Sequence, residues 1–426
     1  MTASVLFHVQ HLLGIGHLQR ALAITEGLAQ SGASVTLVSG GEPIAALAAA
    51  PARVVQLPPV RARDARFELV DSRGQPIDEA LREARRTALL AAFAAARPEV
   101  VVIEGFPFAR RAFRFELDPL IAAVGAQRPR PLLLCSIRDI LVRRDDPRRN
   151  MEIIARVRAD FDAVLVHGDP SFIALDASFP PAAEIADRVV YTGYVSSGRR
   201  LFAATDAEAG GRGRRKNDNP LDSRPRANED AVGAGALDGR RGEVVVSAGS
   251  GAVGYRLLAA ALAARRAGCL ADHFWRLLAG VNLPGPEFAA LSHDLPPNVA
   301  VERHRADFPD LLRRAQVSVS QAGYNTVLEV LAAEVGAVLV PFDEGQETEQ
   351  GMRAERLAAH QVVEVVATAE LTPARLAPAI ERAAARGPHR LALDTGGAAR
   401  SAELILGMVR NRGRGPEEIG GAAQRG

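Results

Sequence analysis

The strongest constraint on the fold is an alternation of short apolar runs with longer amphipathic stretches, which occurs twice along the chain. In the first series the runs are rich in valine, leucine and isoleucine and lie at 5–9, 34–39, 54–57, 100–103, 132–135, 164–167 and 189–191. Helical patterns separate them, notably at 18–30 and 78–96. Strands that alternate with helices predict parallel βαβ units and a doubly wound sheet.

The second series has the same character, with apolar runs at 243–247, 274–278, 299–302, 317–320, 337–341 and 362–366 and a last helix expected at 398–409. Between the two series, residues 198–242 are rich in glycine, arginine, aspartate, asparagine and proline, which is typical of a flexible insertion. The sequence therefore predicts an α/β protein of two Rossmann-like domains with a cleft between them. We place the domains at 1–195 and 243–410, a flexible linker at 196–242 and a disordered tail at 411–426.

Composition excludes several classes of protein. Hydrophobic residues make up 48% of the chain and charged residues 24%, as in a globular protein. A formal net charge of +2 argues against nucleic acid as the main partner, because no basic excess spans a domain. The two cysteines, Cys135 and Cys269, lie in apolar stretches without metal-ligand spacing and fit a reducing cytoplasm.

The N-terminus and the apolar runs bear on localisation. The first nine residues lack the basic and long apolar regions of a signal peptide. No uncharged run approaches the roughly 20 apolar residues of a membrane-spanning helix. We therefore expect a cytoplasmic protein that touches the inner face of the membrane peripherally at most.

Three glycine-bearing turns stand where a predicted strand is followed by a helix, the place where open α/β sheets bind ligands. The first contains Gly14, Gly16 and His17. Glycine allows close approach of the backbone to a ligand, and a histidine at the mouth of the cleft can act as a general base. His17 could equally cap the helix or bond within the fold. Gln19 occupies the position where a dinucleotide-binding fingerprint requires a third glycine. This difference argues against an NAD-dependent oxidoreductase.

The second turn follows a run of valines and contains Gly249, Ser250 and Gly251. Small residues whose backbone N–H groups precede a helix form an anion-binding pocket that suits a diphosphate. An ordinary tight turn between a strand and a helix has the same appearance, so this turn alone does not decide the ligand.

The third turn is the longest and the most specific, and it opens a helix around Asn325. The amides of Gly323, Asn325 and Thr326 can hold phosphate oxygens. Glu329, one turn into the helix, can accept hydrogen bonds from both hydroxyls of a ribose. The loop after the next strand adds polar side chains that would face the same ligand, at Gln346, Glu349 and Gln350. Singly these residues could be surface positions, but together they favour a nucleotide-sugar site.

The segment Ser320–Ala354 resembles the donor-binding signature of GT-B glycosyltransferases. It is most similar to that of family 28, the family of the lipid-linked GlcNAc transferase of peptidoglycan synthesis. Its matching parts are Glu329-Val330-Leu331-Ala332-Ala333, Val340-Pro341 and Glu349-Gln350 ahead of Arg353-Ala354. Three further parts resemble the family's histidine-ending glycine loop, interdomain hinge and diphosphate loop: Gly14–His17, Thr192–Tyr194 and Gly249-Ser250.

The resemblance implies a bacterial enzyme that moves a hexosyl group, such as an N-acetylhexosaminyl group, from a UDP-linked sugar to a hydroxyl. It implies inversion at the anomeric carbon and no metal or other cofactor. The implied donor contacts are Gly249, Ser250 and Gly323 at the diphosphate, Glu329 at the ribose, Glu349 and Gln350 beside the sugar or ribose, and the backbone near His304 and Arg305 at the nucleobase. His17 becomes the candidate catalytic base.

Several alternatives stay open at this point. Glu104 and Asp139 each follow a predicted strand and could orient the acceptor or His17, or serve as helix cap or salt-bridge partner. A sugar-nucleotide 2-epimerase and a non-catalytic nucleotide-sugar-binding protein share the expected fold. The acceptor is a carbohydrate or a lipid-linked molecule. A mixed apolar and basic stretch at 106–114 could touch a membrane, although core packing explains its aromatics equally well.

Overall fold

The computed structural model of the protein describes most of the chain, namely residues 2–12, 14–63, 68–143, 146–196, 242–249, 254–280, 283–303, 305, 307–343, 347–387 and 390–413. Four residues of the predicted site lie outside the described residues: Ser250, Gly251, His304 and Gln346. The predicted linker, apart from its two end residues, and the predicted tail beyond Gly413 also lie outside them.

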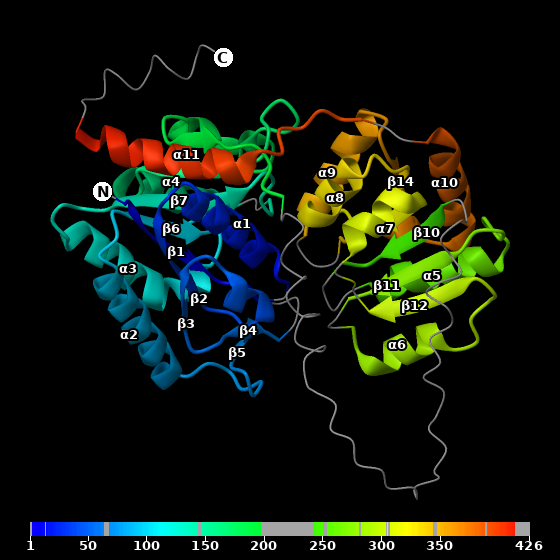
Figure 1. Cartoon of the computed structure of the whole chain (residues 1–426), viewed down its shortest axis with the longest axis horizontal. Coiled ribbons are helices and arrows are strands. Elements are labelled where there is room, and N and C mark those ends of the chain that lie inside the picture. The colour runs from blue at the N-terminus through cyan, green and yellow to red at the C-terminus, as the bar shows by residue number, and fades with distance from the viewer. Residues whose placement is uncertain are drawn as a thin grey trace, which may run out of the picture.

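The N-terminal half forms a seven-stranded parallel sheet in the order β3-β2-β1-β6-β7-β8-β9 (Figure 1). Its strands are β1 (Ser4–Val9), β2 (Ser34–Ser39), β3 (Arg53–Gln56), β6 (Val100–Glu104), β7 (Leu132–Arg138), β8 (Ala163–His167) and β9 (Val189–Tyr191). Helices cover both faces: α1 (Gly16–Gln30), α2 (Glu79–Ala96), α3 (Arg114–Ala126) and α4 (Pro147–Asp160). The central strands are rich in valine and leucine because a parallel sheet is buried on both faces.

The C-terminal half repeats this design with a six-stranded parallel sheet in the order β12-β11-β10-β13-β14-β15. Its strands are β10 (Glu243–Ser247), β11 (Trp275–Ala279), β12 (Val299–Arg303), β13 (Ala315–Ser320), β14 (Ala337–Leu339) and β15 (Glu364–Val365). Its helices are α5 (Tyr255–Arg266), α6 (Gly285–Ser292), α7 (Phe308–Arg314), α8 (Tyr324–Ala332), α9 (Glu349–Ala359) and α10 (Pro373–Arg386). In each sheet the strand order reverses beside the strand that comes first in the sequence, β1 or β10. In such sheets ligands bind at the carboxyl end of the strands where the order reverses.

Minor elements complete the description. A two-stranded antiparallel ribbon, β4 (Arg61–Ala62) with β5 (Leu69–Val70), extends from the N-terminal domain. Short 3-10 helices lie at Ala45–Ala49, Arg111–Phe113, Leu175–Ala177, Pro180–Ile185, Thr368–Glu370 and Asn411–Gly413. The predicted α/β class with two Rossmann-like domains is confirmed. The main local differences are that α1 begins two residues earlier than predicted, so that His17 lies in its first turn, and that the last predicted strand shortens to β15.

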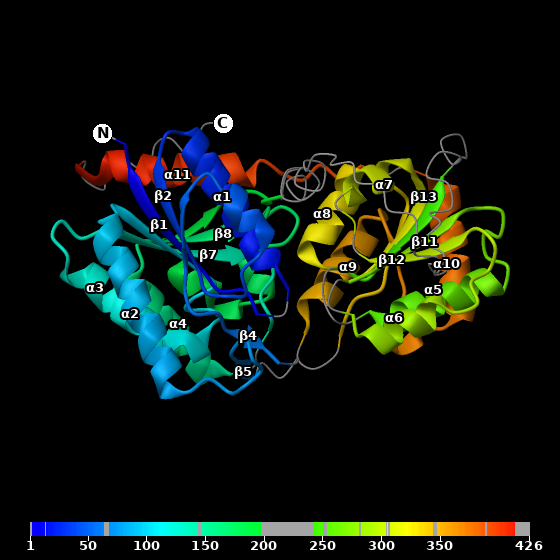
Figure 2. The ribbon, with the colours of Figure 1, turned by 60° about the horizontal axis from the view of Figure 1, so that its bottom comes forward.

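The last helix, α11 (Gly397–Arg410), crosses back to the N-terminal domain and packs along α1 (Figures 1 and 2). Ala402 and Ile405 are fully buried in the same apolar cluster as Leu18 of α1. The sequence assigned this helix to the C-terminal domain at 243–410, because periodicity shows which face of a helix is apolar and not which domain covers it. The first three residues of the predicted tail continue α11 as a 3-10 turn.

The return crossing lies beside the predicted hinge. The backbone N–H of Tyr194 donates to Asp394 O at 2.6 Å, and that of Gly397 donates to Tyr194 O at 3.1 Å. A Cβ on Gly397 would lie 2.4 Å from Gly193 O and 2.7 Å from Tyr194 O. Both atoms belong to the backbone, so position 397 accepts no side chain without displacing the crossing.

Replacing Gly397 with alanine should therefore lower the free energy of unfolding by about 1–3 kcal/mol, the usual cost of overpacking. Chemical denaturation measures this change. Gly407→Ala, in the same helix, is the matched control: its Cβ would meet only the end of Arg410, at 3.9 Å. Alanine is the better helix former, so the control should gain about 0.5–1 kcal/mol. Equal losses in both variants would show that the crossing is not tightly packed.

Candidate active site

The starts of α1 and α8 meet across the domain boundary (Figure 2). Asn325 Nδ2 donates to Gln19 Oε1 at 2.6 Å, and a Cβ on Gly16 would lie 3.4 Å from the same Asn325 nitrogen. A Cβ on Gly14 would meet no atom within 4 Å. Glycine at position 16 thus lets the first predicted turn approach the third one closely.

His17 and Glu104 form a pair at this boundary. Strands β1 and β6 are parallel neighbours, so their carboxyl ends bring the start of α1 beside the end of β6. His17 Nδ1 lies 2.9 Å from Glu104 Oε1; the imidazole is 26% exposed and the carboxylate is buried. Two groups contact Nδ1: Glu104, which only accepts hydrogen bonds, at 2.9 Å, and Arg20 Nη2, which only donates, at 3.2 Å. Because Arg20 Nη2 donates to the Glu104 carboxylate itself, we assign the proton to Nδ1, which leaves Nε2 with a free lone pair. The structure thus places Glu104, of the two predicted acids, against His17.

Two arginines set the charge of this pair. Burial alone would raise the pKa of Glu104, but the Arg20 guanidinium beside it, the hydrogen bond from His17 and the nearby His167 together outweigh burial and hold the pKa well below its usual range. Burial, together with the nearby positive charge of Arg110, lowers the pKa of His17 to about 3 despite its bond to Glu104. Burial also lowers the pKa of Arg110, to about 10. At neutral pH the pair is a neutral imidazole on an ionised carboxylate.

Asp139, the second predicted acid, pairs with Arg353 and not with His17. Arg353 Nη2 donates to Asp139 Oδ1 at 2.8 Å, and its Nη1 donates to Ala322 O at 2.9 Å. Asp139 belongs to the N-terminal domain and Arg353 to α9, and both side chains are almost fully buried. Burial opposes the charge of Arg353, but Asp139 outweighs it and raises the pKa of the guanidinium. This buried ion pair joins the two domains.

Glu349 belongs to the same interdomain contact. Its Oε2 lies 2.6 Å from Arg138 Nη1 and 3.5 Å from Arg353 Nη2, and the side chain is buried. The structure therefore turns Glu349 toward arginines, whereas the sequence predicted a carboxylate facing the donor. The contact with Arg353, one turn along α9, could be seen in the sequence, whereas the contact with Arg138 could not, because Arg138 lies far away along the chain.

Tyr324, the first residue of α8, was not predicted as a site residue. Its ring lies beside two guanidinium groups, 5.5 Å from Arg20 and 5.7 Å from Arg353. Its hydroxyl donates to His167 O at 3.1 Å and accepts from Val195 N at 3.0 Å. The start of the predicted donor helix is therefore bound directly to the N-terminal domain.

The start of α8 leaves backbone donors open to a ligand. Gly323 is the N-cap residue and no side chain caps the helix. A Cβ on Gly323 would meet no atom within 4 Å, and the same holds for Gly249, whose φ of +71° lies in the left-handed region. Thr326 lies half-buried in the first turn. Uncapped amides at a helix start attract anions.

Two further predicted donor residues lie nearby in the sequence. Glu329 is half-buried, and its side chain makes no hydrogen bond or ion pair with another described residue. Burial raises the pKa of its carboxyl to about 7. Gln350 Oε1 accepts from Phe342 N at 3.0 Å, which fixes the side chain at the end of the loop after β14. Glu329 is thus a partly desolvated carboxyl without a side-chain partner in the described part of the chain.

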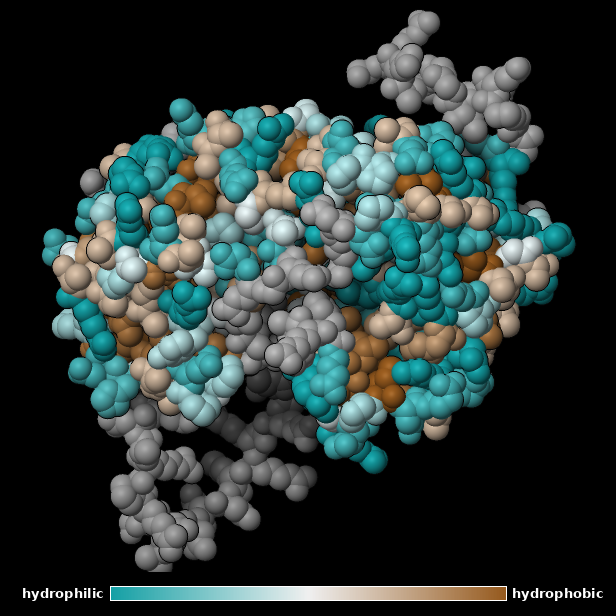
Figure 3. All heavy atoms as spheres, turned by 180° about the vertical axis from the view of Figure 1, so that it is seen from behind, coloured by the Kyte–Doolittle hydropathy of each residue, from teal (hydrophilic) through white to brown (hydrophobic). Residues whose placement is uncertain are grey.

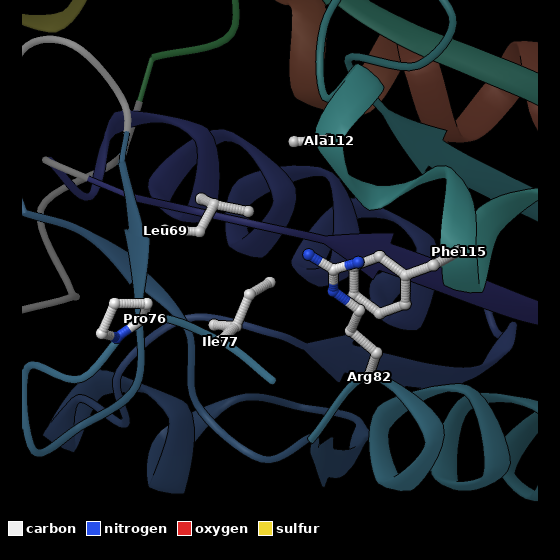
Figure 4. Close-up of a pocket in the computed structure, with 6 residues that line it drawn as sticks. All are labelled: Leu69, Pro76, Ile77, Arg82, Ala112 and Phe115. Atoms are coloured by element: carbon white, nitrogen blue, oxygen red, sulfur yellow. The ribbon is translucent and has the colours of Figure 1, made fainter. Parts of the chain in front are cut away.

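The remaining surface features are a cavity on the N-terminal domain and the stretch 106–114. A cavity of about 530 Å³ on the N-terminal domain is lined by Leu69, Pro76, Ile77, Arg82, Ala112 and Phe115 (Figure 4). From behind, hydrophobic and hydrophilic residues are interspersed over the surface (Figure 3). The aromatics of the stretch 106–114 are buried, which confirms core packing as their role: Phe106, Phe108 and Phe113. Within the described ranges there is no group of three or more potential metal ligands. No helix of the described chain is long and apolar enough to cross a membrane.

Comparisons with known proteins agree with this arrangement. Residues 287–403 match the glycosyltransferase family 28 C-terminal domain. An 85-residue segment is 39% identical to the UDP-N-acetylglucosamine--N-acetylmuramyl-(pentapeptide) pyrophosphoryl-undecaprenol N-acetylglucosamine transferase of Brucella anthropi. That match covers 20% of this chain and 22% of the relative, so the chain spans about a fifth of the relative's length.

Two solved structures share the whole fold. CalG4, the calicheamicin glycosyltransferase, superposes with a TM-score of 0.56 at 18% identity, over 96% of this chain and 95% of its own. MurG of Acinetobacter baumannii superposes with a TM-score of 0.52 at 14% identity, over 96% of this chain and 98% of its own. At these identities the superpositions speak for the fold alone.

Proposed function

We propose that the chain transfers a hexosyl group from a nucleotide sugar to an acceptor hydroxyl. The match of residues 287–403 to the glycosyltransferase family 28 C-terminal domain and the fold shared with solved glycosyltransferases support this proposal. The observation that carries this proposal is the His17–Glu104 pair, which lies across the domain boundary from the uncapped start of α8. Displacement of a diphosphate needs a base on one side of the reacting sugar and an anion-binding group on the other. The His17–Glu104 pair and the first turn of α8 lie on opposite sides of the domain boundary in this way.

His17 acts as the general base. Its Nε2 takes the proton of the acceptor hydroxyl, and the oxygen attacks the anomeric carbon as the bond to the diphosphate breaks. Glu104 stabilises the imidazolium that forms and holds the ring by its Nδ1 proton. Direct displacement by a single activated hydroxyl inverts the configuration of the sugar.

The diphosphate leaves toward the C-terminal domain. The amides at the start of α8, at Gly323, Asn325 and Thr326, offer N–H groups and the positive end of a helix dipole to the departing oxygens. The turn at Gly249 contributes open space, because its own N–H already donates to Ser247 Oγ at 3.2 Å. We propose that the α8 amides neutralise the developing charge and that transfer needs no metal or other cofactor.

Glu329 accepts the ribose hydroxyls, and this role predicts a pH dependence of binding. Two O–H donors require an ionised carboxylate, whereas the pKa of the free carboxyl is about 7. Affinity for a nucleotide sugar should therefore rise as pH increases through 7, by up to about tenfold per pH unit on the acid side, and level off above it. Calorimetry between pH 5.5 and 8.5 measures this; nucleotide sugars suit it because they lack a terminal phosphate that titrates in this range.

Glu329→Gln is the matched variant, since it keeps the size of the side chain and removes its titration. We expect weaker binding with a flat pH profile. A wild-type affinity that is independent of pH, or an unchanged slope in Glu329→Gln, would exclude the ribose role while leaving the transfer reaction open.

The donor we propose is a UDP-linked N-acetylhexosamine, because the curated relative uses UDP-N-acetylglucosamine. The relative's acceptor is carried on undecaprenol, which supports a lipid-linked or carbohydrate acceptor here. A lipid-linked acceptor would bring a cytoplasmic enzyme to the inner face of the membrane by peripheral contact.

Nucleotide release tests the proposed function. The purified protein is incubated with UDP-N-acetylglucosamine, other UDP-hexoses and dTDP-sugars, with and without lipid-linked and free carbohydrate acceptors, and free nucleotide is followed. Acceptor-dependent release of one nucleotide is the expected result. Interconversion of sugar epimers in the absence of an acceptor would indicate an epimerase. Tight binding of a nucleotide sugar without turnover on any acceptor would indicate a binding protein. Either result would overturn the proposal.

A further inference from the structure

A row of buried hydrogen bonds extends behind Glu104, on the side away from His17. Ser136 Oγ contacts Glu104 Oε2, and His167 Nε2 lies 2.9 Å from Ser136 Oγ. His167 Nδ1 in turn lies 2.8 Å from Thr192 Oγ1. All four side chains are at most 1% exposed. The row therefore joins the carboxylate that holds His17 to the segment 192–195, where the chain leaves the N-terminal domain.

The proton positions in this row follow from the charge at its end. Glu104 is ionised and only accepts, so the single proton of Ser136 goes to Glu104 Oε2. Ser136 Oγ must then accept from His167, which places a proton on His167 Nε2. Burial lowers the pKa of His167 to about 3, so the ring is neutral and its unprotonated Nδ1 faces the Thr192 hydroxyl at 2.8 Å. The Thr192 hydroxyl has a second acceptor, Gly193 O, at 2.9 Å. The donors of Ser136 and His167 therefore both point toward Glu104.

A row of hydrogen bonds with one direction polarises each member in turn and strengthens the last bond. A buried polar group that loses its partner is costly, so the row also fixes the Glu104 carboxylate in place. The neighbouring strands explain the geometry, because Glu104 and Ser136 are direct partners in the register of β6 and β7. A core that needed only packing would place apolar side chains at these positions.

We propose that Ser136 and His167 are positioning residues of the transfer reaction, which hold Glu104 so that His17 keeps its proton on Nδ1 and presents Nε2 to the acceptor. This inference rests on the proposed function. The backbone carbonyl of His167 also accepts a hydrogen bond from the Tyr324 hydroxyl of α8. His167 therefore contacts both the row behind the proposed base and the helix proposed to hold the donor.

Charged groups on several elements face this row. Arg20 on α1 bonds Glu104 directly, and Arg110, in the loop after β6, adds a second positive charge. Asp139 follows β7 and is neutralised by Arg353 of α9. Removing the Ser136 hydroxyl leaves the Glu104 charge less delocalised, which favours protonated His17. The acid limb of kcat at saturating donor should therefore move to higher pH in Ser136→Ala.

The proton positions can be measured without any activity. Two-bond ¹⁵N–¹H correlation spectra of histidine-labelled wild-type protein report which ring nitrogen carries the proton, and His17→Gln and His167→Gln assign the signals. The row predicts protonated Nε2 in His167 and protonated Nδ1 in His17 at pH 7. A His167 that carries its proton on Nδ1, or on both nitrogens, would overturn the inference even if the enzyme has no measurable turnover.

Kinetics test the positioning role. Ser136→Ala should lower kcat by about 10- to 100-fold, as for the loss of a hydrogen bond to a charged group, with the donor KM unchanged. His167→Gln should stay close to wild type because its amide reaches the place of Nε2, whereas His167→Asn places its amide near Nδ1 and should lose activity as Ser136→Ala does. Ser401→Ala is the control: this buried hydroxyl donates to Gly397 O within α11.

Nucleotide-sugar affinity and unfolding midpoints establish that each variant is folded. If a variant does not fold, the proton positions measured in the wild-type protein test the inference instead. Wild-type kcat in a folded Ser136→Ala, or equal losses in His167→Gln and His167→Asn, would overturn the positioning role. Absence of transfer by the wild-type enzyme with every donor would instead refute the proposed function, and the spectra would still report on the row.

Discussion

Replacing His17 with alanine should lower kcat by about 10²–10⁴-fold, the usual contribution of a general base. The donor-binding residues proposed above lie on the C-terminal domain, so the affinity for the nucleotide sugar should stay near that of the wild type. Steady-state kinetics and calorimetry separate the two quantities. His293→Ala, which removes an exposed histidine of the other domain, is the control for loss of a histidine as such. Wild-type kcat in a folded His17→Ala protein would exclude His17 as the base.

The same residue predicts the pH dependence of the reaction. A base must be deprotonated, and burial lowers the pKa of His17 from 6.5 to about 3. Activity should therefore persist as pH falls through 6.5 and be lost only near the lowered pKa. The profile of kcat against pH at saturating donor measures this, because saturation removes the separate effect of the Glu329 titration near pH 7 on donor binding. An acid limb of kcat at or above pH 6.5 would contradict the environment described for His17.

Replacing Arg353 with methionine should lower the free energy of unfolding by about 3–5 kcal/mol, because it leaves Asp139 as a buried charge without a partner. Denaturation followed by the fluorescence of Trp275, the single tryptophan, reports on the C-terminal core in which Trp275 is buried. The prediction is large because both members of the pair are almost fully buried and the guanidinium also donates to Ala322 O.

Two comparisons isolate the charge effect. Arg353→Met combined with Asp139→Leu should recover much of the lost stability, since removing both charges leaves none buried alone. Arg313→Met breaks an exposed pair with Asp310 and should change stability by less than about 1 kcal/mol. A loss in Arg353→Met no larger than that in Arg313→Met would show that the interdomain pair is well solvated.

The fold was predictable because it depends on local pattern. Runs of valine and leucine identify buried strands wherever they occur, and parallel strands bring their carboxyl ends to one edge. That rule places Glu104, which ends β6, and His17, which follows β1, at the same edge. Their 2.9 Å contact is therefore a consequence of strand order as much as of the two residues.

The remaining site residues depend on contacts that no local pattern shows. Asp139 and Arg353 are 214 positions apart, and each looks like an ordinary surface charge in sequence. Ser136 and His167 lie in strands whose other residues are mostly apolar, and their meaning appears only when β6, β7 and β8 stand side by side. A signal was present nonetheless: polar residues near the carboxyl ends of adjacent buried strands. The contact of Glu349 with Arg138 could not be predicted for the same reason, since Arg138 lies on the other domain, and the role of Glu349 at the donor stays a prediction.

The crossing at Tyr194 and Asp394 limits the motions open to the two domains. Val195 and Gly396 pair as a short antiparallel bridge, so the outgoing and returning stretches of chain leave the N-terminal domain side by side. Backbone hydrogen bonds at Tyr194 and Gly397 therefore hold the returning stretch on the N-terminal domain. The C-terminal domain should turn about this point when the domains move apart. Each opening would carry Tyr324 away from His167 and each closing would return it to the same place.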